Sequence, residues 1–211
     1  MSKPIKYPFI TTPRASAAFT WLDKPDTAFG DEKYKVTLVF NKDDLGDGRI
    51  ERGSKAVSGK EFMAYILELC NKHGVPARPG ERGCPIKDGD KMADKEGNPR
   101  EQFANCWVIQ LKSGFKPDLV DTKGSALPAS VSILNGDIVK ALVVPAYRNV
   151  NGSDYLSLYL NKVCLVEKRV TATFDSSVFG EDDGYVVPTN PEPVSADADD
   201  STTYSEEDFD F

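Results

Sequence analysis

Residues 171–211 contain no lysine or arginine and carry twelve acidic side chains. Proline, serine, threonine and alanine fill much of the remaining sequence. A segment of this composition repels itself and buries little apolar surface, which is typical of a disordered tail. We therefore predict one folded domain over residues 1–170 and a disordered acidic tail over residues 171–211, with the boundary near Arg169.

The net charge of −7 is the sum of two opposite parts. Of the 33 acidic side chains, 21 lie in residues 1–170 together with all 26 lysines and arginines. The body therefore has a charge near +5 and the tail a charge near −12. A modestly basic body joined to an acidic tail is an electrostatic arrangement, and it indicates that the body binds an anionic partner.

Alternation of apolar and polar side chains is the main secondary-structure signal in residues 1–170. The strands that it predicts are residues 34–40, 103–113 and 155–167. A nearly continuous apolar run predicts a strand over residues 137–147, and residues 14–22 also resemble a strand. One helix is predicted over residues 61–72, where apolar side chains recur at helical spacing and Gly74 and Pro76 follow. Residues 41–59 and 74–100 are rich in glycine and charge, and we expect loops there.

Five antiparallel strands and one helix predict a mainly β fold, a five-stranded Greek-key OB-fold barrel. A β-sandwich fits the same pattern of strands. The predicted helix lies between the second and third strands, whereas an OB-fold helix more usually follows the third. This difference leaves room for a strand that the alternation does not reveal.

Exposed rings beside basic side chains predict a surface for single-stranded nucleic acid. Tyr155 and Tyr159 alternate with Leu156, Leu158 and Leu160, so their rings face away from the core. Bases stack on such rings while lysine and arginine neutralise phosphates. The alternative is that each ring belongs to the core, which we favour for Trp107. The candidate residues are Trp21, Lys24, Lys33, Lys35, Lys112, Phe115, Lys116, Tyr147, Arg148, Tyr155 and Tyr159.

Other motifs give weaker matches to known chemistry. The segment 53–60 has the wrong glycine spacing for a phosphate loop, and Glu61 follows where Ser or Thr is needed. The acidic residues of segment 88–96 do not keep the spacing of a calcium loop. Cys70, His73 and Cys84 lack a fourth zinc ligand at regular spacing. We predict no metal, no cofactor and no catalytic residue, with the four cysteines reduced.

The chain stops on aromatic residues alternating with acids. A solubility tail needs no rings, whereas carboxylates with rings imitate the phosphates and bases of a single strand. We predict that this end occupies the cleft of the body or binds a basic pocket on a partner. The residues concerned are Glu206, Glu207, Asp208, Phe209, Asp210 and Phe211.

Several segments, in this order, resemble the single-stranded DNA-binding proteins of short-tailed bacteriophages. They are residues 21–27, 34–38, 88–90, 120–124, 135–139 and 156–163, followed by the acidic tail ending in Phe211. The resemblance covers most of residues 14–168. It implies an OB-fold that coats single-stranded DNA without sequence specificity during phage DNA replication, recombination and repair.

The resemblance also implies partners. These are DNA polymerase and other replication proteins, contacted through the acidic tail, and a second copy of the chain in a homodimer. No secretory signal opens the chain and no run of about 18 apolar residues occurs, so we expect a protein of the cytoplasm of the infected bacterium, without membrane contact. Two alternatives stay open: a metal-dependent nuclease using Asp88, Asp90 and Asp94, and a protein that mimics DNA to occupy a host enzyme.

Overall fold

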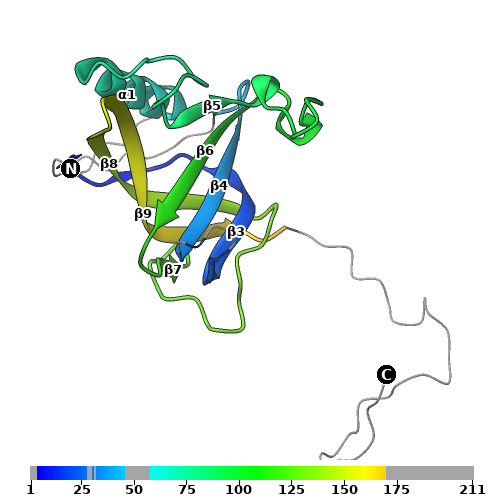
Figure 1. The fold of residues 1–211 in the computed structure, drawn as a ribbon. Coiled ribbons are helices and arrows are strands. Elements are labelled where there is room, and N and C mark those ends of the chain that lie inside the picture. Colours follow the sequence, from blue (N-terminus) through cyan, green and yellow to red (C-terminus); the bar gives the residue numbers. More distant parts are fainter. Residues whose placement is uncertain (1–3, 28–29, 31, 46–57, 170–211) are drawn as a thin grey trace, which may run out of the picture. The chain divides into compact units, whose positions relative to one another are not determined.

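A computed structural model describes residues 4–27, 30, 32–45 and 58–169 (Figure 1). The strands are β1 (Ile5–Lys6), β2 (Ile10–Thr11), β3 (Ala15–Asp26), β4 (Lys33–Asn41), β5 (Ile86–Asp88), β6 (Cys106–Ser113), β7 (Asp118–Val120), β8 (Ile138–Val150) and β9 (Ser153–Glu167). The helices are α1 (Gly59–Lys72) and two short 3-10 helices, η1 (Gly89–Lys91) and η2 (Glu101–Phe103). The predicted acidic tail lies outside the described residues and stays a prediction.

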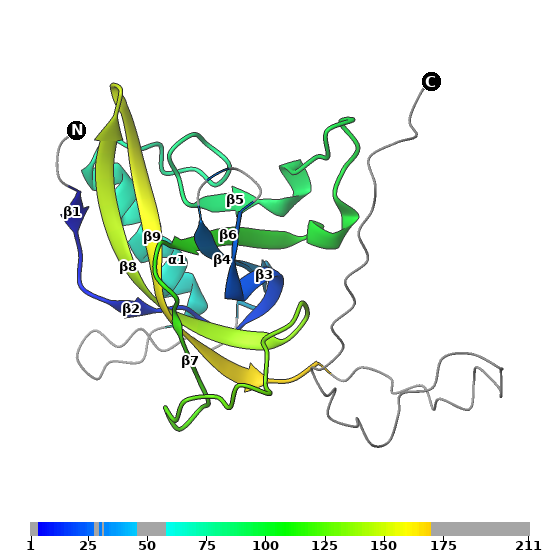
Figure 2. The ribbon, with the colours of Figure 1, turned by 60° about the horizontal axis from the view of Figure 1, so that its bottom comes forward.

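The five long strands close into a barrel in the order β3, β4, β6, β9, β8 and back to β3 (Figures 1 and 2). Neighbours around this ring are antiparallel except β6 and β9, which run parallel. This connectivity is the Greek-key order of the OB-fold, and it confirms the predicted fold class. The closed ring also argues against the sandwich alternative. Helix α1 lies between the second and third barrel strands, as the sequence predicts.

Alternation along the barrel strands creates the core. Val36, Leu38 and Phe40 of β4 point inward and are buried, as are Ile109 and Leu111 of β6. Each such side chain stabilises the fold by about 1.5–3 kcal/mol through apolar burial. Leu156, Leu158 and Leu160 of β9 complete the same core, and Tyr155 and Tyr159, on the other face of the strand, are only half-buried. The parity predicted for β9 is therefore confirmed.

Helix α1 packs its apolar stripe against the end of the barrel. Phe62, Ile66 and Cys70 are fully buried on this stripe. The helix begins with a capping box, in which Ser58 accepts from the backbone N–H of Glu61 and the Glu61 carboxylate accepts from that of Ser58. This reciprocal cap satisfies donors that a helix start otherwise leaves unpaired. Among the described residues, no helix is long and apolar enough to cross a membrane.

The short elements were not predicted. Strands β1 and β2 pair with the outer edge of β8 and lie beside it in Figure 2. Strand β5 pairs with β6, and β7 pairs in parallel with β9. The prediction of an unbroken loop over residues 74–100 is wrong, because β5 and η1 lie there. The third barrel strand begins at Cys106 instead of residue 103, because η2 occupies Glu101–Phe103.

A bulge in β3 sets the face on which Trp21 lies. The pairing of β3 with β4 shifts register between Ala18 and Trp21, and Phe19 within this shift has a φ of 48°. A positive φ is rare for a residue with a side chain, and here it accompanies the irregular pairing of a bulge. The shift brings Trp21 opposite Lys35 of β4.

Candidate nucleic-acid interface

Four predicted residues form one row across the barrel. The register pairs Trp21 of β3 with Lys35 of β4, Lys35 with Lys112 of β6, and Lys112 with Tyr159 of β9. Paired residues on neighbouring strands point to the same face of a sheet. The row therefore places a ring at each end and two ammonium groups between them. We call these four residues the transverse row.

A basic groove opens beside the transverse row, between β6 and β9. The two strands pair through Lys112 and Tyr159, and both of these side chains line the groove. Lys33, Lys87 and Arg148 line the same groove, and no described lining residue is a carboxylate. The groove thus gathers four cations and no carboxylate among its described lining residues.

The charges in this groove act on one another. The pKa of Lys112 is lowered, first by partial burial and then by the neighbouring charges of Lys35, Lys87 and Arg148. Like charges held close together raise each other's free energy, and an anion that enters the groove relieves the repulsion. The electrostatics therefore favour a bound polyanion.

Lys35 has a second role within the transverse row. Its Nζ lies 2.6 Å from Oδ2 of Asp26, and both side chains are largely buried. An ion pair removed from solvent keeps its geometry because breaking it leaves an uncompensated charge. Asp26 therefore fixes Lys35 between Trp21 and Lys112 and offsets part of its charge.

Tyr155 precedes Tyr159 on β9 and lies opposite Arg148 of β8. Its hydroxyl accepts a hydrogen bond of 3.1 Å from Nε of Arg82, whose guanidinium lies 5.9 Å from the ring centroid. The ring is half-buried and adjoins the groove through Leu156 and Arg148. The structure thus adds Arg82 to the basic side chains around the hairpin between β8 and β9.

The remaining predicted residues line two further depressions. Phe115 is 85% exposed and lies with Lys116 on a depression that Tyr159 separates from the basic groove. Lys116 also lines a third depression, which includes Trp21 and Lys24. Shared lining residues therefore connect all three hollows around one side of the barrel.

Tyr147 is the predicted residue that the structure separates from this surface. Its ring stacks on His73 with centroids 4.1 Å apart and planes at 8°, and its hydroxyl donates to Asp154 at 2.7 Å. Tyr7 contacts the same imidazole through its hydroxyl. These contacts connect the end of α1 to the β8–β9 hairpin and use the ring of Tyr147 for packing. His73 accordingly lies in an aromatic cluster, away from the groove.

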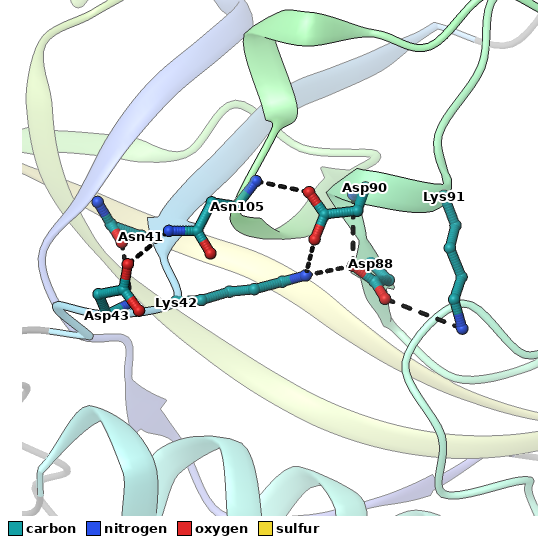
Figure 3. A network of polar contacts seen from close by, with 7 residues as sticks. All are labelled: Asn41, Lys42, Asp43, Asp88, Asp90, Lys91 and Asn105. Atoms are coloured by element: carbon teal, nitrogen blue, oxygen red, sulfur yellow. Dashed lines mark hydrogen bonds and ion pairs between the residues drawn. The ribbon is translucent and has the colours of Figure 1, made fainter.

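Two of the three loop acids considered for a nuclease, Asp88 and Asp90, belong to one structural network (Figure 3). Nζ of Lys42 lies 2.5 Å from both Oδ1 of Asp88 and Oδ2 of Asp90. Asp90 also accepts from the backbone N–H of Asn105 at 2.6 Å. The bond from Lys42, followed by that from Asn105, lowers the pKa of Asp90. The ammonium thus occupies the position between the carboxylates where a metal ion would sit.

The third proposed nuclease carboxylate belongs to a separate turn. Asp94 accepts from the backbone N–H groups of Glu96 and Asn98, and from the side chain of Asn98. Its hydrogen bonds close the loop between Met92 and Arg100, so it does not join Asp88 and Asp90. Within the described residues, no three of the histidine, cysteine and acidic side chains form a cluster that could hold a metal ion.

The remaining sequence motifs have local roles. Cys70 and Cys84 are buried and reduced, and a thiol–thiol hydrogen bond followed by burial raises the pKa of Cys70. Trp107 is half-buried against the core beneath the ammonium of Lys42, at 4.4 Å. Most of the segment compared with a phosphate loop lies outside the described residues, and its end begins helix α1.

Sequence reasoning missed several side chains of this surface. Lys87 was hidden because it lies on β5, a strand too short to show alternation. Gln110 and Ser157 line the groove, but neither is aromatic or charged. Gln110 could have been found from its outward position on β6, two residues from Lys112.

The fold and the surface together define an OB-fold with a basic, ring-flanked face. No family model and no curated protein match the chain. Several solved structures have a similar fold. One is a C-terminally truncated single-stranded DNA-binding protein from bacteriophage Enc34, with a TM-score of 0.55 and 21% identity over 80% of this chain and 97% of that one.

Two other solved structures have the same fold. The bacteriophage Enc34 protein in complex with single-stranded DNA matches at a TM-score of 0.54 and 22% identity, over 77% of this chain and 88% of that one. The single-stranded DNA-binding protein gp2.5 of bacteriophage T7 matches at a TM-score of 0.51 and 19% identity, over 87% of this chain and 100% of that one. At these identities the likeness establishes the fold of the chain.

Proposed function

We propose that this chain is a non-enzymatic protein that binds single-stranded DNA without sequence specificity. The transverse row carries the proposal, since Trp21 and Tyr159 offer base-stacking faces on either side of Lys35 and Lys112. Stacking on a ring is tolerant of sequence because every base has a flat face, and cations bind phosphates of any sequence. The face of the second and third barrel strands is also the face on which OB-folds bind oligonucleotides.

The names of the solved structures support the same function. Two bacteriophage proteins with this fold are described as single-stranded DNA-binding proteins, and one of them was solved with single-stranded DNA. The basic groove of this chain contributes support that is independent of those names. Its described lining residues include Lys33, Lys87, Lys112 and Arg148 and no acid.

We further propose that the protein acts in phage DNA replication, recombination and repair, in the cytoplasm of an infected bacterium. In this proposal the acidic tail over residues 171–211 competes with DNA for the basic face and recruits DNA polymerase and other replication proteins. The support comes from the sequence: twelve acids without a base, and Phe209 and Phe211 at the tip. Formation of a homodimer belongs to the same proposal.

A metal-dependent nuclease is less well supported. The ammonium of Lys42 already lies between Asp88 and Asp90, and Asp94 belongs to another turn. A nuclease centre needs carboxylates free to bind the metal ion. Incubation of the protein with single-stranded DNA and Mg²⁺ tests this alternative, and we expect intact DNA. Cleavage that is lost in Asp88→Asn and Asp90→Asn variants would revive it.

A fluorescence titration tests the proposed function. We expect the full chain to bind an oligonucleotide more tightly as a single strand than as a duplex of the same sequence. Binding should weaken with salt, with a logarithmic slope of about −3 if four phosphates are neutralised. Equal affinity for both forms, or absence of binding at low salt, would contradict the proposal. A DNA mimic would bind neither form.

A further inference from the structure

A second hollow adjoins the basic groove on the opposite side of Tyr159. Ser113, Gly114 and Tyr159 line both, so the ring of Tyr159 lies at their common border. The far wall of this second hollow comes from the N-terminal segment, through Lys6 and Phe9. We call this second hollow the N-terminal depression.

The N-terminal depression combines exposed rings with positive charge. Phe9 is 51% exposed and Phe115 is 85% exposed, and both line it. Lys6 and Lys116 supply ammonium groups, Asn161 supplies an amide, and no described lining residue is a carboxylate. A single exposed phenylalanine is ordinary. The N-terminal depression has two exposed phenylalanines and two lysines, and the transverse row likewise combines two aromatic rings with two lysines.

The fold holds the N-terminal wall in place. Strand β1 pairs with β8 through Ile5 with Tyr147 and Lys6 with Ala146, and the Tyr7 N–H donates to the carbonyl of Pro145 at 2.9 Å. Strand β2 then pairs Ile10 with Val143. Phe9 therefore sits between two points of attachment to β8, so its ring is presented on a fixed backbone. Figure 2 shows β1 and β2 lying along β8. A fixed ring loses less freedom when a base stacks on it.

We propose that Lys6, Phe9, Phe115 and Lys116 form a second station for the same single strand, reached by passing over Tyr159. This inference rests on the proposed function and adds a path to it. The strand runs along the basic groove, crosses the border at Tyr159, and continues over the outer side of β8 and β9. The N-terminal segment thereby becomes part of the binding surface, and the site is longer than the row alone.

Continuity favours a nucleic-acid strand as the occupant. The two hollows share lining residues, and none of the described residues that line them is an acid, so a strand that leaves the groove continues to meet positive charge. The acidic, aromatic-tipped tail is the competing occupant of similar chemistry. A polynucleotide extends across both hollows at once, which makes the contribution of the second one depend on its length.

Length dependence gives the test. Full-length protein and its Phe9→Ala variant are titrated with oligothymidylates of about 5 and about 12 nucleotides, a span that OB-fold sites cover. We expect the variant to lose about tenfold in affinity for the longer strand, as expected for loss of one stacked base, and to bind the shorter one unchanged. Lys6→Ala should make the logarithmic salt slope of the longer strand about 0.7 less steep.

Two further variants keep the test specific. Phe9→Tyr retains a ring and should restore the affinity for the longer strand. Ile5→Ala removes an apolar side chain that is 52% exposed on β1 but does not line the depression, and it should change neither affinity. Thermal unfolding of each variant shows whether the fold is intact.

Each of the following outcomes would contradict the inference. An unchanged affinity of Phe9→Ala for the longer strand removes the second station while the proposed function stands. A gain in affinity for both lengths would assign the depression to the acidic tail. Failure of the unaltered protein to bind either length would contradict the proposed function itself, and the second station with it.

Discussion

Lys112 and Tyr159 are partners across the parallel pairing that closes the barrel between β6 and β9. The pairing places an ammonium group and an aromatic ring side by side in the lining of the basic groove. A base and its adjacent phosphate can therefore be bound by neighbouring side chains. The geometry that completes the fold also builds the centre of the candidate site.

The ring of Tyr159 should carry a large part of the affinity. Tyr159→Ala removes a stacking face at the border of two hollows, and we expect a loss of roughly 1–3 kcal/mol in binding free energy. Tyr159→Phe keeps the ring and should bind normally. Fluorescence titration of both variants measures the effect. Equal losses in the two variants would show that the hydroxyl acts, not stacking.

Replacement of Lys112 should stabilise the fold and weaken the binding of single strands. Its lowered pKa means that the folded state disfavours its charge, so this destabilisation is present at neutral pH and disappears as pH rises. Because Lys112 is exposed and solvent screens this repulsion, Lys112→Met should raise the thermal midpoint only slightly while it weakens binding to single strands. Calorimetry and titration of the same sample check both signs. A lower midpoint would show that packing outweighs repulsion.

The same pKa predicts a pH dependence of binding. Bound phosphates favour charged Lys112, whereas the free protein begins to lose that charge below the ordinary lysine value of 10.5. Affinity for single strands should therefore decline as pH rises into the alkaline range, with proton uptake on binding. In the Lys112→Met variant this decline should be smaller. A titration series at constant ionic strength gives the measurement.

Asp137 should stabilise the end of the barrel. Its carboxylate is buried, and it accepts from the backbone N–H groups of Leu134 and Arg169 and from Nζ of Lys168. Burial raises its pKa, but these three donors outweigh burial, and the net shift is downward. The stabilisation is therefore present above the ordinary value of 3.8 and is lost as pH falls through the lowered folded value.

Substitution of Asp137 isolates this contribution. Asp137→Asn should reduce the free energy of unfolding by about 2 kcal/mol at neutral pH, because hydrogen bonds to a charged acceptor are lost. The deficit should shrink as the pH falls below the ordinary value of 3.8. Denaturant unfolding at several pH values measures it. A deficit independent of pH would mean that the carboxylate charge is not what matters.

Removal of residues 171–211 tests the role of the acidic tail. Residues 1–170 have a net charge near +5, and loss of a tethered polyanion with twelve acids should raise affinity for single strands, most at low salt. Titration of the full and shortened chains at two salt concentrations provides the comparison. An unchanged or lower affinity after removal would exclude competition by the tail, while DNA binding itself would stand.

The barrel strands and the helix could be predicted because they are long enough to show a regular apolar period or, over residues 137–147, a nearly continuous apolar run. Leu156, Leu158 and Leu160 identified the inner face of β9, and the structure agrees. Strands of two or three residues, such as β1 and β5, are too short to contain a period. Their formation depends on pairing with β8 and β6, which only the folded chain supplies.

The site could be predicted by residue type but not by arrangement. Outward rings and cations were visible in the sequence, yet the parallel pairing of Lys112 with Tyr159 joins strands that are far apart along the chain. Tyr147 looks like an exposed ring next to Arg148, but the stacked imidazole of His73 packs against it. Contacts of this kind depend on tertiary structure, so a local pattern does not reveal them.

The fluorescence of Trp21 tests the central claim most directly. The chain has two tryptophans, so Trp107→Phe leaves Trp21 as the sole tryptophan. The matched control is Trp21→Phe, which leaves the half-buried Trp107. We predict that single-stranded DNA quenches Trp21 saturably, because a base stacks on its exposed ring, and leaves the emission of Trp107 nearly unchanged. Binding of single strands without any change in Trp21 emission would contradict the transverse row as the binding face.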